Sequence, residues 1–214
     1  MIGKLSHRRG FATVQVKSTE FMNKIGLLLL PLAVCWLPTP ANALPGQTTD
    51  VVTTWIQAHP TLRPGSGERL MVRKSNSPAQ RFLFQASVLP PGRATPAPDS
   101  SIISHERIEL FDSINGVTRD RLEESLRSIY GSDIYQDYTQ ARVVYEYPSP
   151  LAINQARTQS TPLRESLQGQ LRQGVRFAYW VETAEPRDGI AVTGRMVVFL
   201  RSDLDKMETE LRNR

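Results

Sequence analysis

The sequence predicts an α+β protein that has an antiparallel sheet of about five to six strands with helices packed on one face. Three observations lead to this class. Several short segments alternate apolar and polar residues, as half-buried strands do. Segments with helical apolar spacing lie between and after these strands, and the chain contains no internal repeat or heptad pattern. Adjacent strands with helices between and after them are typical of an α+β architecture.

The first half of the chain contains two expected helices and three expected strands. Thr48 or Thr49 can cap a helix that ends at His59-Pro60, because hydroxyl side chains accept hydrogen bonds from the free N–H groups of a first turn. Thr118 caps a second helix, which Gly131 ends. Strands are expected at 69–74, 81–89 and 102–111, and turns at 63–67, 75–78 and 115–116.

The second half is expected to add a strand, a long hairpin and three helices. Ser132 and Thr161-Pro162 each begin a short helix, the second because proline suits the first helical position. Ser202 and Asp205 form a capping box for a last helix. Strands are expected at 140–147, 175–181 and 190–200, the last two paired as a hairpin.

Residues 22–43 have the three parts of a cleaved secretory signal. Lys24 supplies the positive start, residues 25–37 are apolar, and Ala41-Asn42-Ala43 is a small-x-small cleavage site. The apolar run is too short for a membrane span, which needs about 20 residues. We therefore expect cleavage near Ala43 and export to the periplasm or the thylakoid lumen. The expected boundaries are 1–21 for an upstream start or leader extension, 22–43 for the signal peptide and 44–214 for one globular domain.

Two other export routes remain open. Ser6-His7-Arg8-Arg9-Gly10-Phe11 resembles a twin-arginine signal, although the gap between it and Ile25 is long for that pathway. Leu32-Ala33-Val34-Cys35 resembles a lipobox, although Val34 stands where a smaller residue is expected.

The composition after cleavage excludes several classes of function. The whole chain has 26 Lys+Arg and 21 Asp+Glu, and residues 1–43 hold five of the bases and one of the acids. Residues 44–214 therefore hold 21 bases and 20 acids, a net charge of +1, which removes the electrostatic basis for nucleic-acid binding. The only cysteine, Cys35, lies in the leader. No disulfide, thiol nucleophile or cysteine metal site is then expected in the processed chain.

The acidic and histidine motifs do not form a complete catalytic signature. His105-Glu106-Arg107-Ile108-Glu109 lacks the second histidine of a zinc motif. The pairs Asp133/Asp137 and Asp120/Glu124 could serve acid–base hydrolysis, but acids in a first helical turn also stabilise the helix dipole. Gly65-Ser66-Gly67 is neither a nucleophile elbow nor a dinucleotide loop. We expect no cofactor, no metal and no assigned catalytic residue.

Aromatic and arginine residues concentrate between 130 and 180. All six tyrosines lie there, and tyrosine, tryptophan and arginine are the residue types enriched at binding hot spots. The alternative explanation is that several of these rings fill the core. The candidate partner-binding surface consists of Tyr135, Tyr138, Arg142, Arg176 and Trp180.

Four short stretches resemble an uncharacterised family of exported proteins from cyanobacteria. They are 111–118 (FDSINGVT), 128–131 (SIYG), 89–93 (LPPGR) and 177–182 (FAYWVE). The resemblance covers most of the chain after the leader. It implies a periplasmic or thylakoid-lumen setting, and it supplies no activity and no functional residues.

Three functions are compatible with these patterns. The first is a non-enzymatic exported protein that binds a protein partner or a membrane complex through the aromatic and arginine residues. The second is a periplasmic binder of a small anionic ligand, with an arginine of the sheet holding a carboxylate or phosphate. The third is a hydrolase that uses a carboxylate pair.

Overall fold

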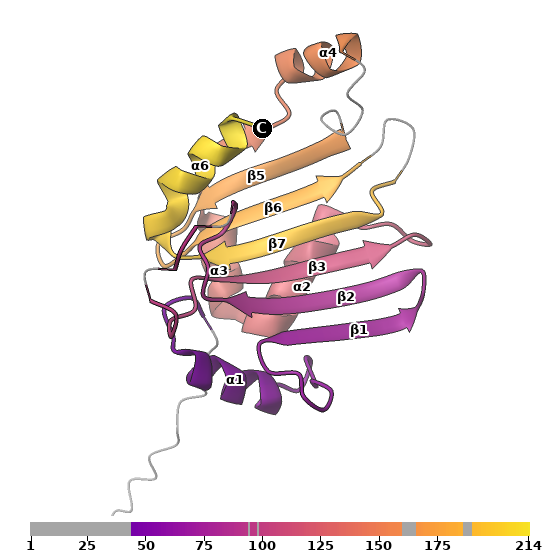
Figure 1. The fold of residues 1–214 in the computed structure, drawn as a ribbon. Helices are drawn as coiled ribbons and strands as arrows, with labels where there is room; N and C mark the ends of the chain where they lie inside the picture. Colours follow the sequence, from indigo (N-terminus) through magenta and orange to yellow (C-terminus); the bar gives the residue numbers. More distant parts are fainter. Residues whose placement is uncertain (1–43, 94, 98, 160–165, 186–189) are drawn as a thin grey trace, which may run out of the picture. The chain divides into compact units, whose positions relative to one another are not determined.

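A seven-stranded antiparallel sheet organises the chain (Figure 1). The computed structural model describes residues 44–214, apart from 94, 98, 160–165, 186–189 and the side chains of 156 and 157. The spatial order of the strands is β1-β2-β3-β7-β6-β5-β4, so the last strand of the chain lies in the middle of the sheet. The strands are β1 (Met71–Ser77), β2 (Gln80–Ser87), β3 (His105–Asp112), β4 (Arg142–Tyr147), β5 (Leu167–Gln173), β6 (Ala178–Ala184) and β7 (Thr193–Phe199).

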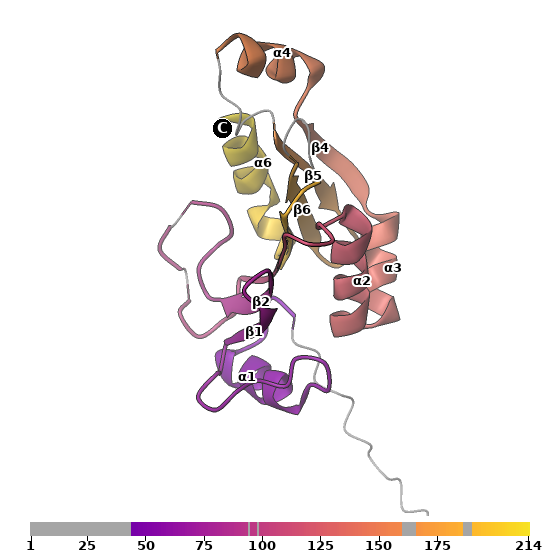
Figure 2. The same cartoon turned by 90° about the vertical axis from the view of Figure 1, so that its right-hand side faces the viewer.

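Three helices contribute to a core on one face of the sheet. They are α1 (Thr49–Ala58), α2 (Arg119–Tyr130) and α3 (Ser132–Gln140). Leu122 and Leu126 of α2 and Tyr138 of α3 are fully buried in the same cluster as Phe84 and Tyr179 of the sheet. Figure 2 views the sheet close to edge-on, with α2 and α3 on one side and α6 on the other.

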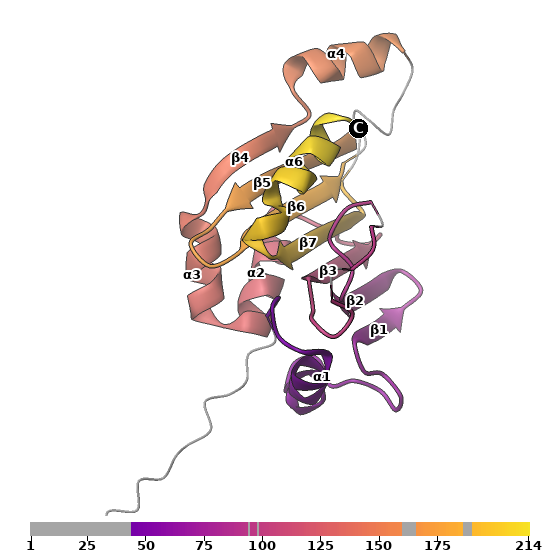
Figure 3. The ribbon, with the colours of Figure 1, turned by 60° about the vertical axis from the view of Figure 1, so that its left-hand side comes forward.

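The opposite face has a second, smaller core. Helix α6 (Leu204–Arg212) follows a 3₁₀ turn, η1 (Arg201–Asp203), and buries Met207 and Leu211 against Trp180, Val197 and Phe199. Because successive side chains of a strand point to opposite faces, β6 and β7 supply both cores. Helix α4 (Pro150–Thr158) follows β4 at the sheet edge (Figure 3). Within the described ranges, no helix has the length and apolar character needed to cross a bilayer.

The α+β class and most of the expected elements are confirmed. Thr48 caps α1 through a bond from Val51 N, and Thr118 caps α2 through a bond from Arg121 N. The hairpin of β6 and β7 pairs antiparallel, with Trp180 opposite Val197. The turn at Asn115-Gly116 is also present, with φ of 75° at Gly116.

Several details differ from the expectation. The sheet has seven strands rather than five or six, because Leu167–Gln173 forms β5 although its glutamines and glycine give no alternating apolar pattern. Helices pack on both faces, since α6 lies against the second core. Helix α6 begins at Leu204, and no side chain caps it, so the expected capping box is absent. The helix expected from Thr161 lies mostly outside the described residues, whereas α4 was not expected.

Asp137 fixes the turn between β5 and β6. Its Oδ1 accepts hydrogen bonds from Val175 N at 2.9 Å and Arg176 N at 3.1 Å. Its Oδ2 accepts bonds from Phe177 N at 3.3 Å and the Tyr179 hydroxyl at 2.6 Å. A buried carboxylate that satisfies three backbone N–H groups is a structural element of the fold.

We expect Asp137→Ala to lower the free energy of unfolding by about 3 kcal/mol, because it leaves several buried donors without acceptors. The matched control is Asp133→Ala, on the exposed first turn of the same helix, which should cost less than about 1 kcal/mol. Urea denaturation measures both values. Equal losses for the two variants would contradict the assigned role of Asp137.

Glu106 is a fully buried carboxyl group in the larger core. It lies on β3 between Ala86 of β2 and Val198 of β7. The Tyr130 hydroxyl donates to its Oε2 at 2.6 Å, whereas Oε1 makes no hydrogen bond to any described residue. Burial raises the pKa of Glu106 from 4.5 to about 7, and the bond from Tyr130 opposes this shift. The folded state therefore favours the protonated acid.

A raised carboxyl pKa stabilises the fold at low pH, and this contribution is lost as the pH rises from about 4.5 to about 7. Glu106→Gln removes the titration while keeping a polar side chain of similar size. We compare the free energy of unfolding of this variant with that of the wild type at each pH. We expect the difference to shift in favour of the variant by about 3 kcal/mol between pH 4.5 and pH 8. Chemical denaturation at both pH values measures the difference. A difference that does not change with pH would show that Glu106 titrates normally.

Candidate functional site

Half of one sheet face carries no helix among the described residues, and we call this surface the open face. Figure 1 looks onto it, with α6 beside β5–β7 and no helix in front of β1–β3. Strand register places Arg73, Leu83, Glu109 and Arg195 in one row across β1, β2, β3 and β7. The open face consists of Arg73, Arg81, Leu83, Gln85, Arg107, Glu109, Phe111, Thr193 and Arg195.

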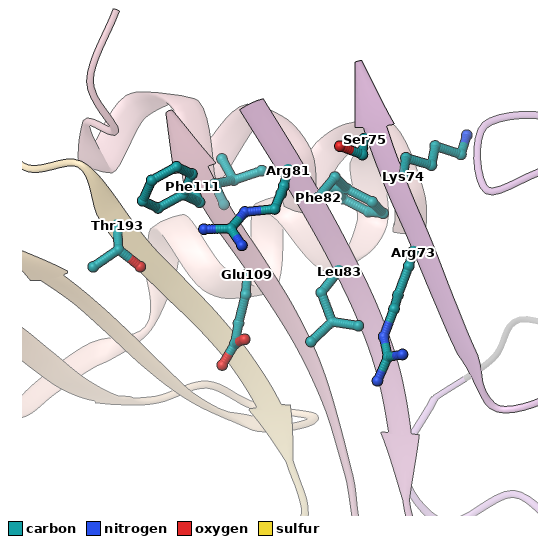
Figure 4. A pocket seen from close by; sticks show the side chains of 10 residues that line it. Arg73, Lys74, Ser75, Arg81, Phe82, Leu83, Glu109, Phe111 and Thr193 are labelled. Carbon is teal, nitrogen blue, oxygen red and sulfur yellow. The ribbon is translucent and has the colours of Figure 1, made fainter. Parts of the chain in front are cut away.

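A hollow of about 490 Å³ occupies the part of the open face farther from α6, and we call it the first hollow. Its apolar lining includes Leu83 and Phe111, and the charged residues of its lining are Arg73, Lys74, Arg81 and Glu109. The Nζ of Lys74 donates to the Thr61 carbonyl oxygen, so of these residues Arg73, Arg81 and Glu109 are the charged groups on the open face. Figure 4 shows the Arg81 side chain reaching toward Phe111 and Glu109. The guanidinium carbon of Arg81 lies 4.2 Å from the centre of the Phe111 ring. The ring therefore holds an arginine in place while leaving its charge accessible.

A second hollow of about 340 Å³ lies closer to α6. Residues 89–93, which we call the strap, form one wall beside α6 and the sheet. Lys206 Nζ donates to the carbonyl oxygens of Pro91 at 2.6 Å and Arg93 at 3.2 Å. Glu210 accepts a bond from Arg93 N at 2.7 Å and pairs with Lys206 at 3.1 Å. These bonds tie the strap to α6.

A buried polar network lies next to the second hollow. Trp180 Nε1 donates to the Tyr147 hydroxyl at 2.7 Å, and that hydroxyl donates to Glu182 at 2.5 Å. Glu182, only 2% exposed, also pairs with Arg195 at 3.2 Å and Arg214 at 2.7 Å. Burial, together with the charge of Glu182, raises the pKa of Tyr147 well above its usual value, so the phenol stays protonated. The guanidinium carbons of Arg195 and Arg214 lie 5.1 and 4.9 Å from the Trp180 ring centre.

The structure does not bring the five sequence-predicted surface residues together. Tyr138 and Trp180 are buried on opposite faces of the sheet, in the larger and the smaller core respectively. Tyr138 donates to Glu123 at 2.9 Å, and Tyr135 is half-buried beside the larger core. Arg142 and Arg176 are exposed. The binding role of the five stays a prediction, but only Tyr135, Arg142 and Arg176 have accessible side chains.

The candidate catalytic residues have other roles in the fold. Asp137 holds the β5–β6 turn, so the Asp133/Asp137 pair does not present two free carboxylates. His105 Nδ1 contacts the Leu89 carbonyl oxygen at 2.7 Å, and Glu106 points into the opposite core. Within the described part of the chain, no group of three or more His, Cys, Asp or Glu side chains is placed to hold a metal ion.

Sequence reasoning missed the open face, although a signal for it was present. In the second expected strand, Phe82, Phe84 and Ala86 alternate onto one face, so Arg81 and Leu83 must lie on the other. Pairing of β3 with β7 then brings Arg107 next to Val197 and Glu109 next to Arg195. This long-range pairing cannot be read from local spacing.

The chain was compared with family models, with curated proteins and with solved structures, and none of the three comparisons finds a match.

Proposed function

We propose that this protein is an exported, non-enzymatic binding protein whose first hollow holds a small anionic ligand that also has an apolar or flat portion. The observation that carries the proposal is the Arg81 guanidinium stacked on Phe111 inside this hollow. Two cations of the lining, Arg73 and Arg81, lie on the open face together with one carboxylate, Glu109, whereas the Lys74 amine donates to the Thr61 carbonyl oxygen.

The chemistry of these side chains suits such a ligand. The planar guanidinium groups of Arg73 and Arg81 can hold a carboxylate or phosphate through two parallel hydrogen bonds. Leu83 and Phe111 supply apolar contact beside them. Glu109 is already paired with Arg107 at 3.3 Å, which reduces its repulsion of an anion. The volume lies within the range of roughly 300–1,000 Å³ usual for small-molecule sites.

Export is part of the proposal, and it rests on residues 22–43, which lie outside the described residues. Their basic start, apolar run and Ala41-Asn42-Ala43 site support processing before Leu44. The proposed location is the periplasm or the thylakoid lumen. Binding of a protein partner or membrane complex through Tyr135, Arg142 and Arg176 is the second candidate, since these side chains are accessible.

The ligand proposal is tested by calorimetric titration of protein isolated from the exported fraction, whose first peptide should begin at Leu44. The probes are octanoate, benzoate and phenylacetate, each compared with an uncharged analogue. We expect saturable binding of at least one anion and none of its analogue. Arg81→Gln should weaken that binding about tenfold, which corresponds to about 1.4 kcal/mol.

The matched control is Arg142→Gln, which removes the same charge from β4 and should leave the affinity unchanged. Absence of saturable binding by all three anions would overturn the proposal. Equal weakening by the two variants would show that the anions respond to overall charge rather than to the first hollow.

A further inference from the structure

We infer that the second hollow is a separate oxyanion site, which takes a compact and multiply charged group such as inorganic phosphate, sulfate or a phosphate monoester. The two hollows have no lining residue in common. This site therefore does not depend on the ligand proposed for the first hollow.

The lining of the second hollow carries an excess of positive charge. Four arginines, Arg93, Arg107, Arg195 and Arg214, line the second hollow, and Glu210 is the acidic residue of its lining. Glu210 is already paired with Lys206 at 3.1 Å and accepts a bond from Arg93 N. Glu182 pairs with Arg195 and Arg214, and Glu109 pairs with Arg107. The four arginines and Lys206 still outnumber these two carboxylates and Glu210, so the hollow keeps an excess of positive charge.

The arginines of the second hollow are held in place by neighbouring side chains. Glu182 forms ion pairs with Arg195 and Arg214, and both guanidinium groups also lie close to the Trp180 ring. Arg107 Nη2 donates to Gln85 Oε1 at 2.6 Å, which holds this guanidinium against β2. Preorganised donors bind an anion better than mobile ones, because less side-chain entropy is lost on binding.

Glu109 fixes Arg107 on its other side. The Nε of Arg107 is buried and lies 3.3 Å from Glu109 Oε1, so this ion pair also holds the guanidinium in place. An oxyanion has acceptors on all sides, so it can accept bonds from several guanidinium N–H groups that converge on one position.

The size and lining of the second hollow suit a different ligand from the one proposed for the first hollow. The strap and α6 enclose it, and Figure 3 shows the loop after β2 passing beside α6. The second hollow has a volume of about 340 Å³, whereas the first has about 490 Å³. Polar side chains such as Gln85, Ser87 and His105 line the second hollow beside the arginines. A small, hydrophilic oxyanion fits this lining better than an amphiphile does.

Trp180 offers a direct reporter of the site. The chain has three tryptophans, Trp36, Trp55 and Trp180, and of the last two only Trp180 lines the second hollow. Full-length protein labelled with 5-fluorotryptophan is titrated with potassium phosphate at constant ionic strength, and the ¹⁹F spectrum is recorded. The Trp180 resonance is assigned by its loss in Trp180→Phe. We expect this resonance to shift in a saturable way while that of Trp55 does not move.

Three variants give the expected pattern. Arg107→Gln should weaken phosphate binding at least tenfold. Arg93→Gln, at the surface of the strap, should weaken it several-fold. This second variant provides the test if Arg107→Gln does not fold. Arg81→Gln removes the same charge from the first hollow and should change phosphate affinity less than twofold. Sulfate and glycerol phosphate are tested alongside. Binding of phosphate and sulfate alone supports a free-oxyanion site, and binding of glycerol phosphate as well supports a phosphoryl group on a larger ligand.

Two results would overturn the inference. One is a Trp180 resonance that does not shift in a saturable way at up to 50 mM phosphate. The other is equal weakening by Arg107→Gln and Arg81→Gln, which would indicate a diffuse basic surface. Neither result bears on the titration of amphiphilic anions at the first hollow, so the two proposals fail separately.

Discussion

The arrangement of this protein depends on the mismatch between one short helix and a seven-stranded sheet. Helix α6 has nine residues, and a helix with its side chains is about 10 Å wide. The outer strands β1 and β4 lie about 29 Å apart, since neighbouring strands are about 4.8 Å apart. Helix α6 therefore covers only the β4–β7 part of its face. The opposite face has α1, α2 and α3 in a larger core.

The side chains on this face of the sheet differ between the part that α6 covers and the part that it leaves uncovered. Under α6, the sheet presents Leu171, Trp180, Val197 and Phe199. On β1–β3 the same face presents arginines and Glu109, which can remain hydrated without a covering layer. Glu182 lies at the boundary, buried beside Trp180 and paired with Arg195 and Arg214. This boundary network fixes the cations that line the second hollow, whereas Arg81 and Phe111 form the first hollow beyond the reach of α6.

The local elements could be predicted where a physical signal lies within a few residues. Thr48 and Thr118 mark helix starts, and alternation defines β2, β6 and β7. Strand β5 could not be predicted, because Gly169 and Gln170 pair on both sides without an apolar pattern. The aromatic grouping of 130–180 depended on proximity in sequence, but Tyr138 and Trp180 lie on opposite faces. The open face depends on the pairing of β3 with β7, which joins segments more than 80 residues apart.

The central claim is that the open face is an accessible, electropositive surface in the native protein. Residues 44–214 contain no cysteine, so a single thiol can be placed at will in a Cys35→Ser background. Thr193→Cys lies on the open face, and Ser128→Cys is an exposed control on α2. The rates of reaction with an anionic and a neutral aromatic disulfide are measured for each. The account predicts a higher anionic-to-neutral rate ratio at position 193 than at 128, and a difference that shrinks as salt is added. Equal ratios at low salt, or a thiol at 193 that does not react, would contradict it.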